Sequence, residues 1–168
     1  ITITMKNIKL ELKWALIFVG MSLAWMVLEK AVGLHSTHID KHLYLTNLFA
    51  IPAIWFMVLA LKDKKKNFYN GNMSYRQGLI TGIIVSLFIA LLSPLTQWIT
   101  SYLISPEYFQ NVIKRSVELG YFETTAEAEA NFNYKNYAIN STLFAFVFGV
   151  VTTAIAMIFI RTKSQKSD

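Results

Sequence analysis

Four long apolar stretches constrain this sequence more than any other feature. They run over residues 14–33, 43–61, 79–104 and 137–160, and each approaches or reaches the ~17–25 residues that a helix needs to cross the hydrocarbon core of a bilayer. With 54% hydrophobic and 15% charged residues and a mean hydropathy of +0.41, the chain is too apolar for an ordinary soluble domain. We therefore predict an all-α membrane protein in which residues 1–168 form one four-span domain.

The first stretch is the least regular of the four, because Glu29 and Lys30 interrupt it. A basic front followed by an apolar run is also typical of a signal peptide. The charged pair is a poor approach to a cleavage site, so we interpret residues 14–33 as a span that stays in the protein. Met5 is a more natural start of the chain than the leading Ile-Thr-Ile-Thr.

The distribution of charge predicts the orientation of the spans. If the N-terminus lies inside, the inner segments hold 11 of the 16 Lys and Arg residues against three acids, and the outer segments hold the other five against seven acids. This asymmetry follows the positive-inside rule, so we expect both termini on the cytoplasmic side. The basic run over residues 62–66 directly follows a span, which favours an anchor beside anionic lipid over a nucleic-acid site.

Small residues recur at four-residue intervals in the last two spans. Lipid offers no hydrophobic drive between helices, so spans associate where small residues let their backbones approach closely. We predict that the third and fourth spans pack together along two such series. They are Gly78, Gly82, Ser86 and Ala90 in the third span, and Ser141, Ala145, Gly149 and Thr153 in the fourth.

The segment between the third and fourth spans, residues 106–135, predicts an extramembrane hairpin of two amphipathic helices. Ser105 and Pro106 are a typical N-cap and first helical residue, and Gly120 is a typical stop. Thr124 and Glu127 have the spacing of a capping box at the start of a second helix. The hairpin is a lid, a docking surface for a partner, or a connector at the lipid interface. Docking would use the apolar face formed by Phe109, Val112 and Ile113, with Ser116 and Val117 beside it.

The order and spacing of these features resemble one known family. They include Trp14 at the start of the first span, the Gly33-Leu34-His35 segment after it, and the Ile104-Ser105-Pro106 segment after the third. Further shared positions are Trp25, Glu29, Asn47, Pro52, Gln77, Gly78, Gly82, Phe109, the Thr-Ala-Glu-Ala segment ending at residue 128, Phe132 and Gly149. Over nearly its whole length the chain resembles the bacterial family catalogued as domain of unknown function forty-one ninety-nine. The resemblance implies a small four-span inner-membrane protein and brings no assigned activity.

Polar residues gather in the predicted outer halves of the spans. Glu29, Asn47, Gln97 and Asn140 all fall there, and we interpret them as an intramembrane polar layer. Glu29 is the most informative member, because an ionisable group inside a span is costly and marks a functional site by default. The alternatives are that it extends to the headgroups or pairs with a neighbouring span to hold the bundle together.

Three histidines in eight residues follow the first span. On a helical turn His35, His38 and His42 would share a face, and Asp40 or Glu29 would complete a tetrahedral zinc site. Gly33 and the Ser36-Thr37 pair favour a turn instead, in which that shared face is lost. The alternatives are solvated interface histidines and a proton-responsive role.

The sequence carries no motif that assigns an activity. The absence of cysteine excludes disulfides, thiolate metal sites and cysteine nucleophiles, and the phosphate-loop, Gly-x-Ser-x-Gly and His-Glu-x-x-His signatures are missing. We expect no cofactor and no nucleic-acid partner. We predict a non-catalytic accessory or scaffold subunit that uses the outer hairpin and the small-residue series of its spans to bind a protein partner or a second copy of itself. The alternative is a small oligomeric carrier or channel in which Glu29, Asn47 and Gln97 line the path. Pro52 and Pro94 would then supply breaks in its helices. A membrane enzyme that acts on lipid is the third possibility.

Overall fold

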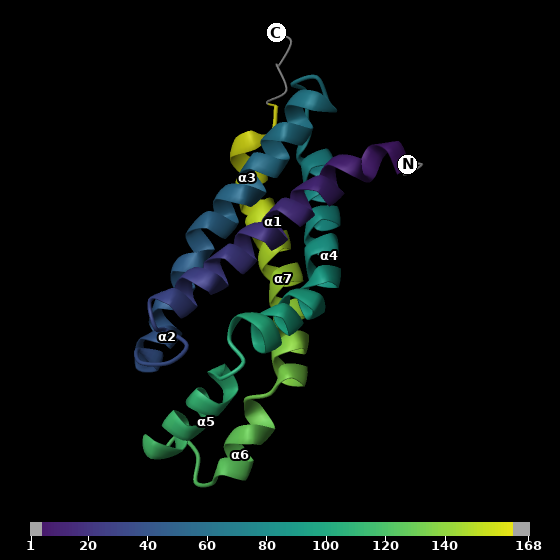
Figure 1. The fold of residues 1–168 in the computed structure, drawn as a ribbon. Helices are drawn as coiled ribbons and strands as arrows, with labels where there is room; N and C mark the ends of the chain where they lie inside the picture. Colours follow the sequence, from purple (N-terminus) through teal and green to yellow (C-terminus); the bar gives the residue numbers. More distant parts are fainter. Residues whose placement is uncertain (1–4, 163–168) are drawn as a thin grey trace.

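The protein is an all-α bundle built from four long apolar helical segments (Figure 1). The computed structural model describes the backbone of residues 5–162 and the side chains of residues 8–162, and no strand occurs in that part of the chain. The leading Ile-Thr-Ile-Thr segment, Lys163 and Lys166 lie outside the described residues. The four segments long and apolar enough to cross a bilayer are 8–31, 39–67, 75–104 and 125–160. The predicted fold class and the number of apolar segments are thus confirmed.

The helices run back and forth between two ends of the bundle. α1 (Met5–Ala31) begins at the end where α7 (Tyr134–Ile160) also finishes, and we call this the terminal end (Figure 1). At the opposite end, α5 (Tyr108–Glu118) and α6 (Thr125–Asn131) project beyond the bundle, and we call it the hairpin end. α3 (Ala50–Asn67) and α4 (Tyr75–Ile99) connect the two ends.

The second apolar segment is less continuous than the sequence predicts. It opens with the short α2 (Ile39–Leu45) and a 3₁₀ turn, η1 (Thr46–Phe49), before α3 begins. Pro52 lies in the first turn of α3, where its missing N–H costs nothing because the first N–H groups of a helix have no partner in the helix. Pro52 therefore marks the start of a helix and not a break within one.

The third apolar segment ends in an unusual turn. α4 continues past Pro94 and passes into a π-helical turn, η2 (Thr100–Ile104). The Ser105 N–H donates to the Thr100 carbonyl over 2.8 Å, which is the i to i+5 hydrogen bond that defines this turn. At the start of α4, Ser74 and Gln77 form a complete capping box.

α4 and α7 make the most extensive helix contact in the described bundle, and their two series of small residues lie along it. A Cβ atom added at Gly78 would lie 2.2 Å from the Met157 sulfur, and one added at Gly149 would lie 2.2 Å from the Ser86 hydroxyl. Side chains of the facing helix therefore occupy the space that a side chain at these two glycines would need. Toward the terminal end this contact continues into the buried apolar core, which contains Ala15, Met57, Leu61, Met73, Val85, Ile89, Ala156 and Met157.

The hairpin segment differs from the sequence prediction at its start. α5 begins at Tyr108, three residues after Ser105, and Glu107 occupies the N-cap position without a side-chain hydrogen bond. The predicted N-cap at Ser105 is wrong, because the Ser105 hydroxyl contacts His35 instead. The predicted stop is confirmed, since Gly120 follows the end of α5 with φ +74°, a conformation that glycine adopts readily.

Candidate functional site

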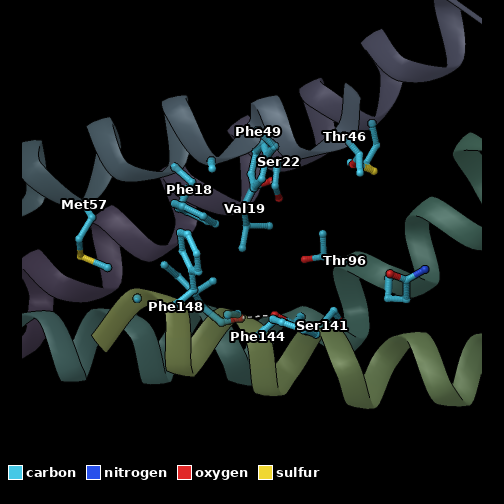
Figure 2. A pocket seen from close by; sticks show the side chains of 18 of the residues that line it. Phe18, Val19, Ser22, Thr46, Phe49, Met57, Thr96, Ser141, Phe144 and Phe148 are labelled. Atoms are coloured by element: carbon cyan, nitrogen blue, oxygen red, sulfur yellow. Dashed lines mark hydrogen bonds between the residues drawn. The ribbon is translucent and has the colours of Figure 1, made fainter. Parts of the chain in front are cut away.

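A cavity of about 450 Å³ lies between α1, η1, α3, α4 and α7 (Figure 2). Its walls are mainly apolar, and rings from three sides point into it: Phe18 from α1, Phe49 from η1, and Phe144 with Phe148 from α7. Polar side chains concentrate toward the hairpin end, where they include Thr46, Asn47, Thr96, Gln97 and Thr100. The cavity is therefore amphipathic along its length.

A buried polar cluster closes the bundle at the hairpin end. We call it the Glu29 cluster: it consists of Glu29, His35 and His42. The Glu29 and His35 side chains are 2% and 6% exposed. Glu29 Oε2 lies 3.2 Å from His35 Nε2 and 3.3 Å from His42 Nε2. The potential ligand atoms of the three residues all lie within 4.8 Å of one another, so the cluster is a compact arrangement of two imidazoles around one carboxylate oxygen.

The backbone that follows α1 brings the three members together. Glu29 lies in the last turns of α1, His35 in the following loop, and His42 in α2. The loop turns sharply at Gly33, which has φ +79° and where a Cβ atom would lie 2.4 Å from the Thr37 hydroxyl. Glycine is therefore required there both for its backbone conformation and for space.

A second layer of side chains holds each member of the Glu29 cluster. The Trp25 Nε1–H, one helical turn before Glu29, donates to Glu29 Oε1 over 2.6 Å. Ser105 Oγ lies 2.6 Å from His35 Nδ1. The Tyr108 hydroxyl lies 3.4 Å from His42 Nδ1. The second polar atom of every member thus has a partner, and these partners orient the cluster.

Helix α5 fixes the loop and α2 from outside. Asn111 donates from its amide nitrogen to the His35 carbonyl over 2.9 Å. Arg115 forms a two-pronged contact with Asp40, with Nε to Oδ1 at 2.7 Å and Nη2 to Oδ2 at 2.8 Å. The hydrogen bonds from Arg115 to Asp40 and Glu118 raise the pKa of the guanidinium, which is charged throughout the accessible pH range. The α5 segment is therefore part of the structure that builds the cluster.

The Tyr108 side chain links the cluster to α7. Its ring packs edge-on against both histidine rings at centroid distances of 5.3 Å, and its hydroxyl lies 3.2 Å from that of Tyr137. Burial raises the pKa of Tyr108 above its ordinary value, and the neighbouring Tyr137 hydroxyl raises it further. Tyr108 therefore stays protonated at neutral pH.

The predicted site residues are only partly brought together. Of the predicted polar layer, Asn47 and Gln97 line the cavity, while Asn140 is exposed and away from the cavity lining. His38 is also exposed, and its Nδ1 lies 3.1 Å from the Val32 carbonyl outside the Glu29 cluster. The shared face of the three histidines is missing because the loop forms successive turns and α2 begins only at residue 39. Of the predicted ligand set, Glu29, His35 and His42 lie together, whereas His38 and Asp40 do not join them, and Asp40 pairs with Arg115.

A second buried charged group lies near the terminal end, and the sequence prediction missed it. Lys64 Nζ lies 2.8 Å from Glu11 Oε1, and both side chains are almost completely buried. Glu11 Oε2 has no hydrogen-bond partner within the described part of the chain, while the Lys64 ammonium also lies 3.9 Å from the centre of the Phe68 ring. Lys64 therefore differs from a solvated anchor. The sequence pattern alone does not distinguish Lys64 from the other lysines of the basic run over residues 62–66.

The family model described as "Protein of unknown function (DUF4199)" matches residues 13–162. The chain belongs to the DUF4199 family. The resemblance that the sequence indicates is thus confirmed over nearly the whole chain, including every member of the Glu29 cluster. Comparisons with curated proteins and with solved structures give no match. The DUF4199 assignment brings no activity, so the function of this member has to be argued from its cavity and its cluster.

Proposed function

We propose that this chain is a non-catalytic accessory protein of the bacterial inner membrane, with both termini on the cytoplasmic side, that holds an amphipathic, lipid-like molecule between its helices. The cavity between α1, η1, α3, α4 and α7 carries the proposal. An apolar cleft with a few placed polar groups is the usual form of a small-molecule site. In this case the cleft lies between segments that are apolar enough to cross a bilayer, and it is partly open on the side of Phe144 and Phe148.

The dimensions of the cavity support a chain-like occupant. On α4 its lining runs from Ile89 to Thr100, which at 1.5 Å per residue is about 16 Å, or roughly half of the hydrocarbon thickness of a bilayer. The aromatic side chains of Phe18, Phe49, Phe144 and Phe148 suit an acyl or isoprenoid chain, and the amides and hydroxyls at the hairpin end suit a polar group attached to it. The occupant is therefore amphipathic with its polar end toward the Glu29 cluster.

The packing beyond the cavity supports binding over transport. A carrier or channel needs polar groups that continue toward the other side of the membrane. Toward the terminal end the cavity instead meets closely packed side chains, of which Leu61, Val85 and Met157 are at most 2% exposed, and the buried charges of Glu11 and Lys64 beyond them pair with each other. Pro94 also lies inside a continuous α4. A bound molecule therefore enters and leaves from one half of the bundle.

The test is analysis of lipids that remain bound to the purified protein. Ala53 and Ala145 line the cavity, so Ala53→Trp and Ala145→Trp fill it, whereas Ala24→Trp adds the same bulk on the exposed surface of α1. We expect native mass spectrometry in mild detergent to show a lipid retained by wild type and Ala24→Trp and absent from both filled variants. Equal retention in all four proteins, each with an unchanged elution volume, contradicts the proposal.

A shallow groove between α5 and α6 supports a second role, as a docking surface for a protein partner. Of the predicted docking residues, Ile113 lines this groove together with Val117, whereas Phe109 packs against Tyr137 within the chain. Affinity purification from native membranes tests this role. We expect a partner at fixed ratio to be lost in the Ile113→Ser and Val117→Ser variants and kept in Tyr44→Ser, which alters an exposed side chain on α2. Retention of the partner in every variant rules out docking in this groove.

A further inference from the structure

We propose that the Glu29 cluster binds one divalent transition-metal ion, with Zn²⁺ as the best-fitting ion, through His35 Nε2, His42 Nε2 and Glu29 Oε2. Two imidazoles and one carboxylate are a ligand set that suits zinc and leave a fourth position open. Hard ions such as Ca²⁺ and Mg²⁺ prefer oxygen ligands, so this set selects against them. The inference does not depend on what occupies the cavity.

Two of the three spacings between the ligand atoms are those of ligands around a small ion. Zinc lies 2.0–2.2 Å from nitrogen and oxygen ligands in a tetrahedral site, which places neighbouring ligand atoms about 3.4 Å apart. The two distances from Glu29 Oε2 to the imidazole nitrogens are 3.2 and 3.3 Å. All three atoms lie within 4.8 Å of one another, so the two imidazoles adjust their separation around the carboxylate oxygen when an ion enters.

The second layer favours the protonation state that a metal site requires. Histidine ligands commonly donate their other ring N–H to a nearby acceptor, which leaves the coordinating nitrogen with its lone pair. The hydroxyl oxygens of Ser105 and Tyr108 stand next to Nδ1 of His35 and His42 and can accept such bonds. With both Nδ1 atoms protonated, two Nε2 lone pairs face the Glu29 carboxylate oxygen. In that tautomer the three atoms form a site for a cation, whereas with both Nε2 atoms protonated the imidazoles donate to the carboxylate and no ion is held.

A hydrolytic serine site is a weaker explanation of the same contacts. Ser105, His35 and Glu29 do form a serine, histidine and carboxylate series. Ser105 is only 2% exposed, so its oxygen is covered and cannot reach the acyl carbon of a substrate. In addition, His42 approaches the same carboxylate oxygen as His35, which a nucleophile and base do not require and a metal site does.

The experiment measures metal bound to the full chain, purified in mild detergent without a histidine tag and stripped with a chelator. The chain is loaded with ZnCl₂ or CoCl₂ alone and separated from free ion before elemental analysis. We expect one Zn²⁺ per wild-type chain and the intense visible bands of tetrahedral Co²⁺. His42→Ala and Glu29→Gln are expected to fall to background, while His38→Ala, which alters an exposed histidine of the same loop, is expected to retain the ion.

A variant outside the ligand set keeps the test decisive if a ligand variant does not fold. Trp25→Phe removes the hydrogen bond to Glu29 Oε1 and leaves all three ligands in place. We expect its affinity for Zn²⁺ to fall about 10- to 100-fold, as is usual when a partner of a ligand is lost. The proposal is overturned if wild type binds no zinc, if binding is equally lost in His38→Ala, or if cobalt gives only the weak spectrum of an octahedral hydrated ion. If Glu29, His35 and His42 bind only protons, the wild-type chain binds no zinc and the proposal fails.

Discussion

The close approach of α4 and α7 at Gly82 makes a quantitative prediction. A Cβ atom at Gly82 would lie 2.1 Å from Thr153 Oγ1 and 2.2 Å from Thr153 Cγ2, whereas carbon atoms in contact ordinarily lie 3.5–4.0 Å apart. Gly82→Ala therefore forces the two helices about 1.4 Å apart or displaces Thr153, which itself donates to the Gly149 carbonyl. Overpacking of this kind costs about 1–3 kcal/mol.

Gly20 provides the matched control, because nothing lies within 4 Å of a Cβ atom built there. Both substitutions replace glycine by alanine within a long helix, so both gain the same helix propensity of about 1 kcal/mol. The difference between the two variants isolates the packing cost. We expect Gly82→Ala to have a free energy of unfolding about 1–3 kcal/mol lower than that of Gly20→Ala.

The assay is reversible unfolding in mixed micelles by titration with SDS, followed by far-UV circular dichroism. A second variant, Gly82→Ala with Thr153→Gly, removes the atoms that the new methyl group meets. We expect the two substitutions to couple by about 0.5–3 kcal/mol in the favourable direction. Equal stability of Gly82→Ala and Gly20→Ala, or purely additive effects in the double variant, refutes the close packing of α4 and α7.

Three further predictions concern buried and exposed charges. Glu11→Gln removes the carboxylate from the buried ion pair with Lys64 and is expected to lower the free energy of unfolding by up to about 5 kcal/mol, whereas the double variant Glu11→Leu with Lys64→Met recovers most of that loss in the same SDS titration. Burial raises the pKa of Tyr108 in the folded chain above its ordinary value near 10, so the unfolded chain loses this proton at a lower pH than the folded chain. The contribution of the buried Tyr108 hydroxyl to stability is therefore complete below about pH 10 and is lost progressively as the pH rises above that value. The fall in stability from pH 9.5 to 11 is therefore expected to be shallower in Tyr108→Phe, and identical slopes would contradict the burial of its hydroxyl. Arg115→Ala removes an exposed pair with Asp40 and is expected to leave the melting temperature nearly unchanged; a clear fall would mean that α5 depends on this pair for its attachment.

The four candidate membrane-spanning segments could be predicted because the length and apolar character of a segment decide whether it can cross a bilayer. Their ends were harder to predict. The sequence places the first span from residue 14, but α1 extends back to Met5, because helical hydrogen bonding continues past the charged residues before Trp14. Glu11 and Lys64 count as interface charges in any such pattern. Only the packing of α1 against α3 shows that they pair inside the protein.

The candidate site was predicted in composition but not in arrangement. Glu29 stands out in the sequence because ionisable groups are rare within an apolar span, and His35 and His42 stand out because three histidines follow that span within eight residues. His38 is equally prominent in the sequence, yet the turns of the loop direct it outward. Ser105 and Tyr108 reach the cluster across more than sixty residues of sequence, so no local spacing rule identifies them. Among the partners of the Glu29 cluster, only Trp25 could be predicted from local spacing, because it lies one helical turn before Glu29.

The π-helical turn at residues 100–104 gives the molecule a distinctive tolerance to insertion and deletion. A π turn accommodates one residue more than an α turn, so deletion of a single residue there is absorbed by a return to α-helical hydrogen bonding. The glycines of α4 lie before the turn and α7 lies after it, and we expect both to keep their register. Ser105 is likewise expected to stay beside His35. A change of length by one residue in this turn is thus expected to leave both the bundle and its polar cluster assembled.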